Sequence, residues 1–128
     1  MVRNFVNALL ASDSSAGVLV GGDLNVFEFG EPGEGTDHTL AILEGTPNEV
    51  PLKNLILLES TEDRFSFVFD GNSQLLDHIL VTPSLLQRHV ATDILHFNSG
   101  YADVFGDDAE TSIRSADHDA VEARFRFN

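Results

Sequence analysis

The chain has 128 residues, of which 42% are hydrophobic, and this is enough to bury one core. It contains no cysteine, which excludes disulfides, thiolate metal sites and cysteine nucleophiles. The formal net charge is -14 and Lys53 is the only lysine, so the surface repels phosphate backbones at long range. Such a charge is typical of a highly soluble protein or of a saline habitat. Alternatively, a polyanionic substrate would approach only through a bound divalent metal.

Nothing in the sequence predicts contact with a membrane. No apolar run approaches the roughly 20 residues that a spanning helix needs. The N-terminus does not resemble a secretory signal, because Asn4 and Asn7 interrupt its short apolar stretch and no proper positive region precedes it. Any export signal is therefore expected upstream of this chain.

The start of the chain has patterns typical of a helix and a strand. The apolar residues of 2–12 recur at helical spacing, so we predict an amphipathic helix there. Val18 to Val20 is a short apolar run of the kind found in buried strands. We expect Gly21 and Gly22 to end it.

Two short helices are predicted next. Glycine and proline make 30–37 a loop, in which Thr36 or Asp37 would cap a short helix through Leu43. Pro51 is suited to the first turn of another helix. The inner side of that helix would be formed by apolar residues, namely Leu52, Leu55, Ile56 and Leu58.

The second half of the chain changes to alternating patterns, which predict strands. Residues 70–74 are expected to form a turn, and 98–115 are too polar for regular structure. The predicted strands are 65–69, 75–81, 88–97 and 121–127. The fold class is therefore α/β (α+β), a mixed, mainly antiparallel sheet covered by helices on one side, in a single domain over 1–128.

Asp23 and Asn25 lie two residues apart just past the first predicted strand. If extended geometry persists, their side chains project to the same side, roughly 7 Å apart, and are able to contact one substrate. The alternative is a turn, because Asp and Asn after glycine often bond to their own backbone and cap the next element.

Asp77 shares a predicted strand face with Leu75, Ile79 and Val81. A carboxylate among apolar neighbours needs a partner, which could be a histidine, an arginine, a metal or several donors. A structural buried salt bridge remains an alternative to a functional role. His78 is on the opposite face and is expected to be a packed or surface histidine.

Asp117, His118 and Asp119 come just before the last predicted strand, with small residues on either side. A carboxylate beside an imidazole supplies a hard metal ligand and a proton-transfer group in one short segment. An ordinary acidic loop would have the same composition. Acidic residues and histidine without cysteine suit Mg²⁺ or Mn²⁺ with a phosphoryl substrate better than they suit zinc.

The ordered motifs "GGDLN", "FVFDGNSQLLDHILV" and "SADHDAV" resemble the endonuclease/exonuclease/phosphatase superfamily. The resemblance is closest to its secreted bacterial nucleases, relatives of pancreatic deoxyribonuclease, and covers essentially the whole chain. It implies a four-layer sandwich of two sheets with helices outside. It also implies hydrolysis of phosphodiesters or phosphomonoesters with a divalent metal, usually Mg²⁺, with Mn²⁺ or Ca²⁺ as alternatives.

The same resemblance implies roles for individual residues. Asp23 would orient or deprotonate the attacking water, and Asn25 would hold the phosphate. Asp117 would be a metal ligand. His118 would contact the scissile phosphate while hydrogen-bonded to Asp77, which supplies the partner that this carboxylate needs.

The chain also departs from the family pattern. An upstream family segment contributes an asparagine, the glutamate that is the principal metal ligand, and a histidine or tyrosine near the phosphate, and this chain matches none of them. Glu28, Glu31 and Glu34 do not occupy that glutamate's place, and Ala120 stands where proline is usual. The chain thus resembles a C-terminal half of the domain, apparently lacking the N-terminal half.

We therefore expect a divalent-metal-dependent phosphodiester hydrolase, foremost a nuclease, with nucleic acid or another phosphodiester as its partner. One alternative is a catalytically weak or inert half-domain that forms a homodimer through the surface left by the missing half and binds metal or phosphate. Another is a phosphomonoesterase or lipid phosphodiesterase of the same family. The related nucleases are often secreted, but the N-terminal pattern does not predict a signal peptide, so the sequence predicts no localisation.

Overall fold

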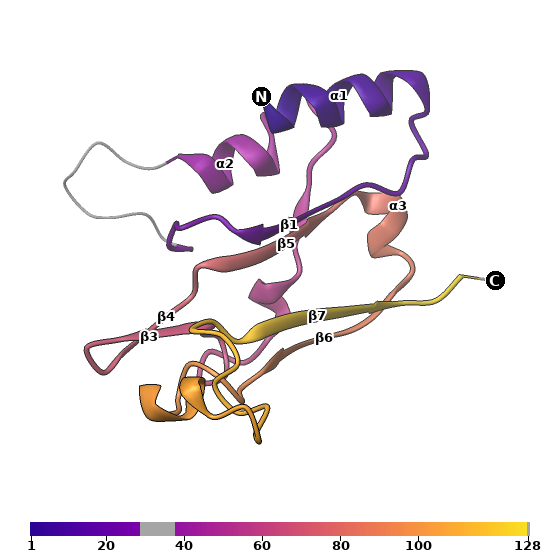
Figure 1. The fold of residues 1–128 in the computed structure, drawn as a ribbon. Coiled ribbons are helices and arrows are strands. Elements are labelled where there is room, and N and C mark those ends of the chain that lie inside the picture. Colours follow the sequence, from indigo (N-terminus) through magenta and orange to yellow (C-terminus); the bar gives the residue numbers. More distant parts are fainter. Residues whose placement is uncertain (29–37, 128) are drawn as a thin grey trace.

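The computed structural model describes residues 1–28 and 38–127 and combines helices with several antiparallel sheets (Figure 1). The predicted α/β class is confirmed. Every strand pair between described residues is antiparallel, so the predicted mixed character is not found in this part of the chain. Among these residues no helix is long and apolar enough to cross a membrane.

Two helices form the outer layer on one side of the molecule (Figure 1). The predicted N-terminal helix is confirmed as α1 (Val2–Ser12), which buries Val6 and Leu10. The short helix α2 (Thr39–Glu44) follows His38 and is confirmed too. The two predicted caps, Thr36 and Asp37, lie outside the described residues.

The central sheet has the strand order β1 (Leu19–Asp23), β5 (Asp77–Val81), β2 (Lys53–Asn54). The prediction that Gly21 and Gly22 end the first strand is wrong, because antiparallel pairing with β5 carries β1 through both glycines to Asp23. Its predicted burial is wrong as well. Leu19 is 47% exposed, since among the described residues β1 pairs with a strand on one side only, which is β5.

The predicted helix after Pro51 is also wrong. The segment forms the short strand β2 and then a single 3-10 turn, η1 (Ile56–Leu58). The Leu55 N–H donates to the Ile79 carbonyl over 2.7 Å, which fastens this segment to β5 in place of a helical hydrogen bond. Leu55 and Ile56 are buried as predicted, whereas Leu58 is exposed.

Strand β5 separates two apolar clusters. Leu80 is fully buried in the first, between the helices and the sheet, and Ile79 and Val81 belong to the second, on the other face. The buried members of the first cluster are Val6, Leu10, Val26, Leu40, Leu43, Leu52 and Leu80, and those of the second are Leu55, Ile56, Leu75, Ile79, Val81, Leu85 and Ile94. The described residues thus form a helix layer, the central sheet and a second sheet (Figure 1).

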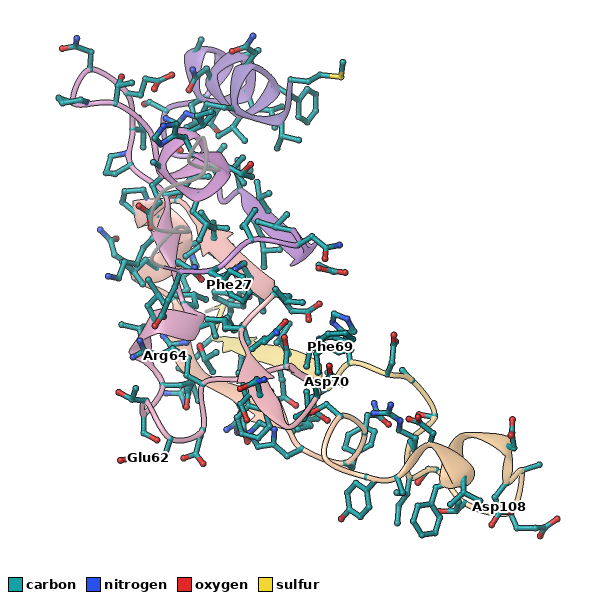
Figure 2. All side chains as sticks on the ribbon, turned by 90° about the vertical axis from the view of Figure 1, so that its left-hand side faces the viewer. Phe27, Glu62, Arg64, Phe69, Asp70 and Asp108 are labelled. Atoms are coloured by element: carbon teal, nitrogen blue, oxygen red, sulfur yellow. The ribbon has the colours of Figure 1, made fainter. Side chains whose placement is uncertain are left out.

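The second sheet pairs β6 (His89–Leu95) with β7 (Ala120–Phe125), as the alternation predicted, and the short helix α3 (Pro83–Leu86) connects it to β5. Between the two strands, the irregular stretch contains one 3-10 helix, η2 (Asp103–Asp107). This stretch projects away from the sheets, with Asp108 near its far end (Figure 2).

The hairpin of β3 (Phe67–Phe69) and β4 (Asn72–Gln74) accounts for the remaining predicted strand. The expected turn is confined to Asp70 and Gly71, whose φ angles are 49° and 78°. Two successive positive φ values are typical of the tight hairpin turn that Asp-Gly favours, so the residues after Gly71 are free to pair as a strand. Phe69 and Asp70 lie at the tip of this hairpin (Figure 2).

Candidate functional site

Three of the predicted site residues meet at one end of the central sheet. Asp23 ends β1, Asp77 begins β5, and His118 lies two residues before β7. One ligand atom from each lies within 4.8 Å of the others. Segments separated by 41 to 95 positions in the chain (118 - 77 and 118 - 23) therefore supply one cluster of two carboxylates and an imidazole.

The register of the central sheet brings the two carboxylates together. Asp23 and Asp77 are direct cross-strand partners in the antiparallel pair of β1 and β5. Like charges in this position destabilise a sheet unless a positive group lies near them. The His118 side chain comes from the segment that leads into the second sheet, lies against this pair, and supplies the positive group when it is protonated.

The predicted hydrogen bond between His118 and Asp77 is present. His118 Nδ1 donates to Asp77 Oδ2 over 2.7 Å, and the Phe67 ring stacks on the imidazole at 4.6 Å between centroids. Partial burial acts to lower the pKa of His118, but the hydrogen bond to Asp77 and the charges of Asp77, Asp23 and Asp117 outweigh it, so this pKa is raised. The surroundings therefore favour the imidazolium form.

Asn25 does not have the predicted extended geometry. Its φ is 52°, its N–H donates to Asp23 Oδ1 over 2.8 Å, and its amide donates to Asp23 Oδ2 over 3.3 Å. The two side chains are thus in direct contact instead of roughly 7 Å apart, because the strand ends at Asp23 and the chain turns. The turn interpretation is confirmed, and the turn keeps Asn25 beside the cluster.

Asp117 is exposed and lies outside the group of three. Its charge still contributes to the raised pKa of His118. A role as metal ligand stays a prediction. Glu28 is bound to Arg64 over 3.1 Å, whereas Glu31 and Glu34 lie outside the described residues.

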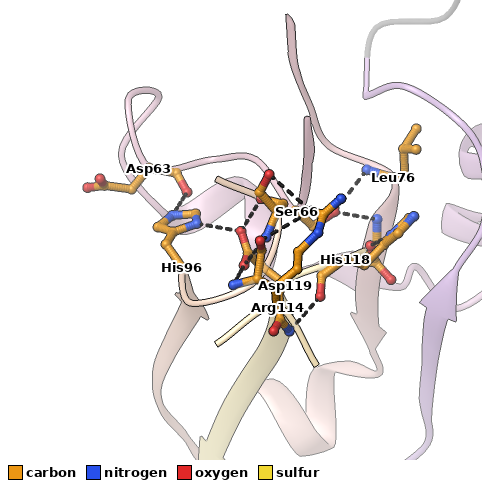
Figure 3. A network of polar contacts seen from close by, with 10 residues as sticks. Asp63, Ser66, Leu76, His96, Arg114, His118 and Asp119 are labelled. Carbon is orange, nitrogen blue, oxygen red and sulfur yellow. Dashed lines mark hydrogen bonds and ion pairs between the residues drawn. The ribbon is translucent and has the colours of Figure 1, made fainter. Parts of the chain in front are cut away.

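Ser66 lies in the predicted strand 65–69, where the sequence pattern assigned it no role, and in the structure it is buried just before β3. Its hydroxyl accepts hydrogen bonds from the N–H groups of Leu76 and Asp77, at 3.3 and 3.2 Å. Its carbonyl accepts the N–H of Asp119 over 2.7 Å (Figure 3). One fully buried serine therefore holds both segments that carry the Asp77–His118 pair. The available signal was a small polar residue between two phenylalanines, Phe65 and Phe67.

Asp119 was quoted in the motif but given no role, and it anchors the loop beside the site. Its carboxylate accepts the N–H groups of Asn98 and Ser99 at 2.8 and 3.0 Å, His96 Nδ1 at 2.9 Å, and the Ser99 hydroxyl. Burial acts to raise the pKa of Asp119, but these hydrogen bonds outweigh it and lower this pKa. The adjacent His118 is thereby attached to a fixed backbone.

His78 has a structural role, in agreement with the expectation of a packed histidine. It is fully buried, with Nδ1 2.9 Å from the Asn54 side-chain nitrogen and Nε2 2.9 Å from the Val26 carbonyl. Because the Asn54 amide donates to Nδ1, the ring is the neutral form that donates from Nε2. This pair supports the segment that follows Asn25.

Comparison of the chain with protein-family models, with curated proteins and with solved structures finds no match.

Proposed function

We propose that this chain carries the catalytic residues of a divalent-metal-dependent phosphodiester hydrolase, foremost a nuclease. The observation that supports this most is the meeting of Asp23, Asp77 and His118 within 4.8 Å, from three segments far apart in sequence. The order of the motifs in the sequence does not by itself require these three side chains to lie close together. The proposed hydrolase needs them close together, and its proposed four-layer fold would place them at the end of the central sheet.

In this proposal His118 binds the phosphate as a cation. Asp77 occupies Nδ1 and fixes the ring, so Nε2 is the atom that would donate to a phosphate oxygen. Asp23 would orient or deprotonate a water for in-line attack on phosphorus, and the Asn25 amide next to it would hold a phosphate oxygen. The Phe67 ring limits the imidazole to one orientation.

The groups available to bind a metal at this site fit a hard cation. They are the carboxylate oxygens of the aspartates, because Nδ1 of His118 is already hydrogen-bonded to Asp77. Mg²⁺ or Mn²⁺ therefore suits the site better than zinc. Asp117 would hold the ion together with the substrate phosphate. When bound, the ion would supply charge stabilisation for the phosphoryl oxygens.

A second candidate is a half-domain with weak activity or none. Two observations favour it: Asp117 lies outside the group of three, and the β1 edge is exposed at Leu19. Mg²⁺ requires exacting geometry, so one remote carboxylate would bind it poorly. In this case the chain would self-associate through the open edge and bind metal or phosphate without turnover.

Hydrolysis of plasmid DNA and of bis(p-nitrophenyl) phosphate, each with Mg²⁺, Mn²⁺ or EDTA, tests the proposal. We expect metal-dependent activity that falls by about 100-fold or more in Asp23→Asn and His118→Ala. Asp93→Asn is the matched control, because it removes an exposed carboxylate from β6 and should retain full activity. Activity that persists with EDTA or in either site variant would overturn the assignment.

Absence of activity in all samples would favour the half-domain. Light scattering would then test the self-association expected of the half-domain. A dimer mass would agree with pairing through the edge of β1, and a monomer mass would contradict it. Cleavage of bis(p-nitrophenyl) phosphate without cleavage of DNA would retain the phosphodiesterase and exclude the nuclease. Cleavage of p-nitrophenyl phosphate alone would indicate the phosphomonoesterase.

A further inference from the structure

A second polar site lies at the opposite end of the sheets from His118. An open pocket of about 600 Å³ is formed where α3 leads into β6, beside the end of β7 and the loop after α1. Its polar lining consists of Ser15, Ser84, Gln87, Arg88, His89 and Arg126. His118 precedes β7 and Arg126 follows it, so the strand separates the two sites by roughly 20 Å.

The charge of this pocket is opposite to that of the chain. The formal net charge is -14, yet none of the described residues that line the pocket is acidic. Four of the seven lysines and arginines form ion pairs with carboxylates, namely Arg3, Arg64, Arg114 and Arg124. Lys53, Arg88 and Arg126 have no such pair among the described residues. Two of these three cations therefore line the same pocket.

The local structure holds the two arginines beside each other. The Arg126 N–H donates to the Arg88 carbonyl over 2.8 Å, which joins their backbones across the sheet. The Arg88 guanidinium lies over the Phe127 ring, 5.2 Å from its centroid, and this contact restricts its position without using its N–H donors. The nearby Asp13 carboxylate is engaged by the N–H and hydroxyl of Ser15.

We propose that this pocket binds a phosphate group, either as the free ion or as a phosphate monoester. Two guanidinium groups present planar sets of N–H donors that match phosphate oxygens, and the neighbouring side-chain amide of Gln87 is able to add a further donor. This site is separate from the His118 cluster, and it does not depend on the proposed hydrolase activity.

Titration of the ¹⁵N-labelled chain with inorganic phosphate, and separately with phenyl phosphate, tests this proposal by NMR. Salt at about 0.15 M, where the Debye length is about 8 Å, screens the net charge of the chain. We expect saturable shifts of the amide signals of Arg88, His89 and Arg126. Binding of both probes would indicate a site for monoesters, and binding of inorganic phosphate alone a site for the free ion.

The Arg88→Gln/Arg126→Gln double variant should weaken binding by about tenfold or more, because charge-assisted hydrogen bonds are lost. Two controls should bind as the parent chain does: Arg124→Gln, whose arginine is already paired with Glu122, and His118→Ala, which alters the other site. Thermal unfolding of the double variant checks that it folds. Shifts that do not saturate, or that persist unchanged in a folded double variant, would overturn the proposal.

Discussion

Replacing Ser66 with alanine should loosen the connection between the two segments that carry Asp77 and His118. The substitution removes one hydroxyl and leaves the backbone bond from Asp119 in place. It leaves the N–H groups of Leu76 and Asp77 without their acceptor in a buried region. The perturbation is therefore confined to two hydrogen bonds at the base of the candidate site.

The structure sets the size of this effect. The two bonds are long, at 3.3 and 3.2 Å, which places each at the weak end of the usual range. At about 1 kcal/mol for each donor left unpaired, Ser66→Ala should lower the free energy of unfolding by about 2 kcal/mol. For a chain of this length that corresponds to a fall in Tm of about 7 °C.

Urea unfolding measures the free energy, and hydrogen exchange of the Leu76 and Asp77 amides localises the change. Ser73→Ala is the matched control, because Ser73 is exposed on β4, and its removal should change stability by less than about 0.5 kcal/mol. If Ser66→Ala were as mild as Ser73→Ala, or if the two amides kept their protection, the assigned role of the hydroxyl would be wrong.

Three further predictions concern the core, the loop anchor and the dependence on pH. Leu80→Ala should lower the free energy of unfolding in urea by about 3 kcal/mol, because Leu80 is fully buried on β5, the middle strand of the central sheet. Asp119→Asn should cost about 2 to 4 kcal/mol in the same assay and expose the Asn98 and Ser99 amides to exchange, since one amide oxygen cannot accept four hydrogen bonds. Backbone and side-chain hydrogen bonds from Thr46, together with one from Asn7, lower the pKa of Glu49 to about 2 from 4.5. Because the pKa of Glu49 is lower in the folded chain than in the unfolded one, the stabilisation is present above pH 4.5 and is lost as the pH falls towards 2. Glu49→Gln should therefore destabilise the chain at pH 7 and have little effect near pH 2.

Each of these predictions has an opposite outcome that is equally measurable. A cost below 1 kcal/mol for Leu80→Ala would mean that the first apolar cluster repacks freely around the shortened side chain. Unchanged exchange at Asn98 in Asp119→Asn would contradict the loop anchor. An effect of Glu49→Gln that is independent of pH would mean that the carboxylate's charge does not contribute to its interactions.

The spacing of hydrophobic residues was sufficient to predict those helices and strands that bury a single face. The helical spacing in 2–12 and the alternation before the C-terminus predicted α1 and β7, because each packs a single apolar face against the core. The same spacing gave wrong predictions where pairing with a distant strand overrides the local conformational preference of the residues. Gly21 and Gly22 remain in a strand because β5 lies beside them, and the residues after Pro51 lie against the same strand instead of coiling into a helix.

The chemistry of Asp77 followed from the sequence alone, since a carboxylate among apolar residues requires a partner. The hydrogen bond from His118 was implied by the resemblance and is present. The turn at Asn25 was one of two interpretations that the residues allowed, and a φ of 52° decides between them. Ser66 and Asp119 escaped notice because most of their partners are backbone N–H groups, which no side-chain pattern records, and all of them lie at least 10 positions away in the chain.

By itself the sequence determined the α/β class, the apolar faces, and the set of acidic and imidazole groups available for chemistry. Only the tertiary structure decided which of these groups meet. Asp23 and Asp77 face each other because of the register of β1 and β5, and His118 joins them because Ser66 and Asp119 hold its segment against the sheet. These contacts join residues far apart in the chain, so no local pattern specifies their geometry.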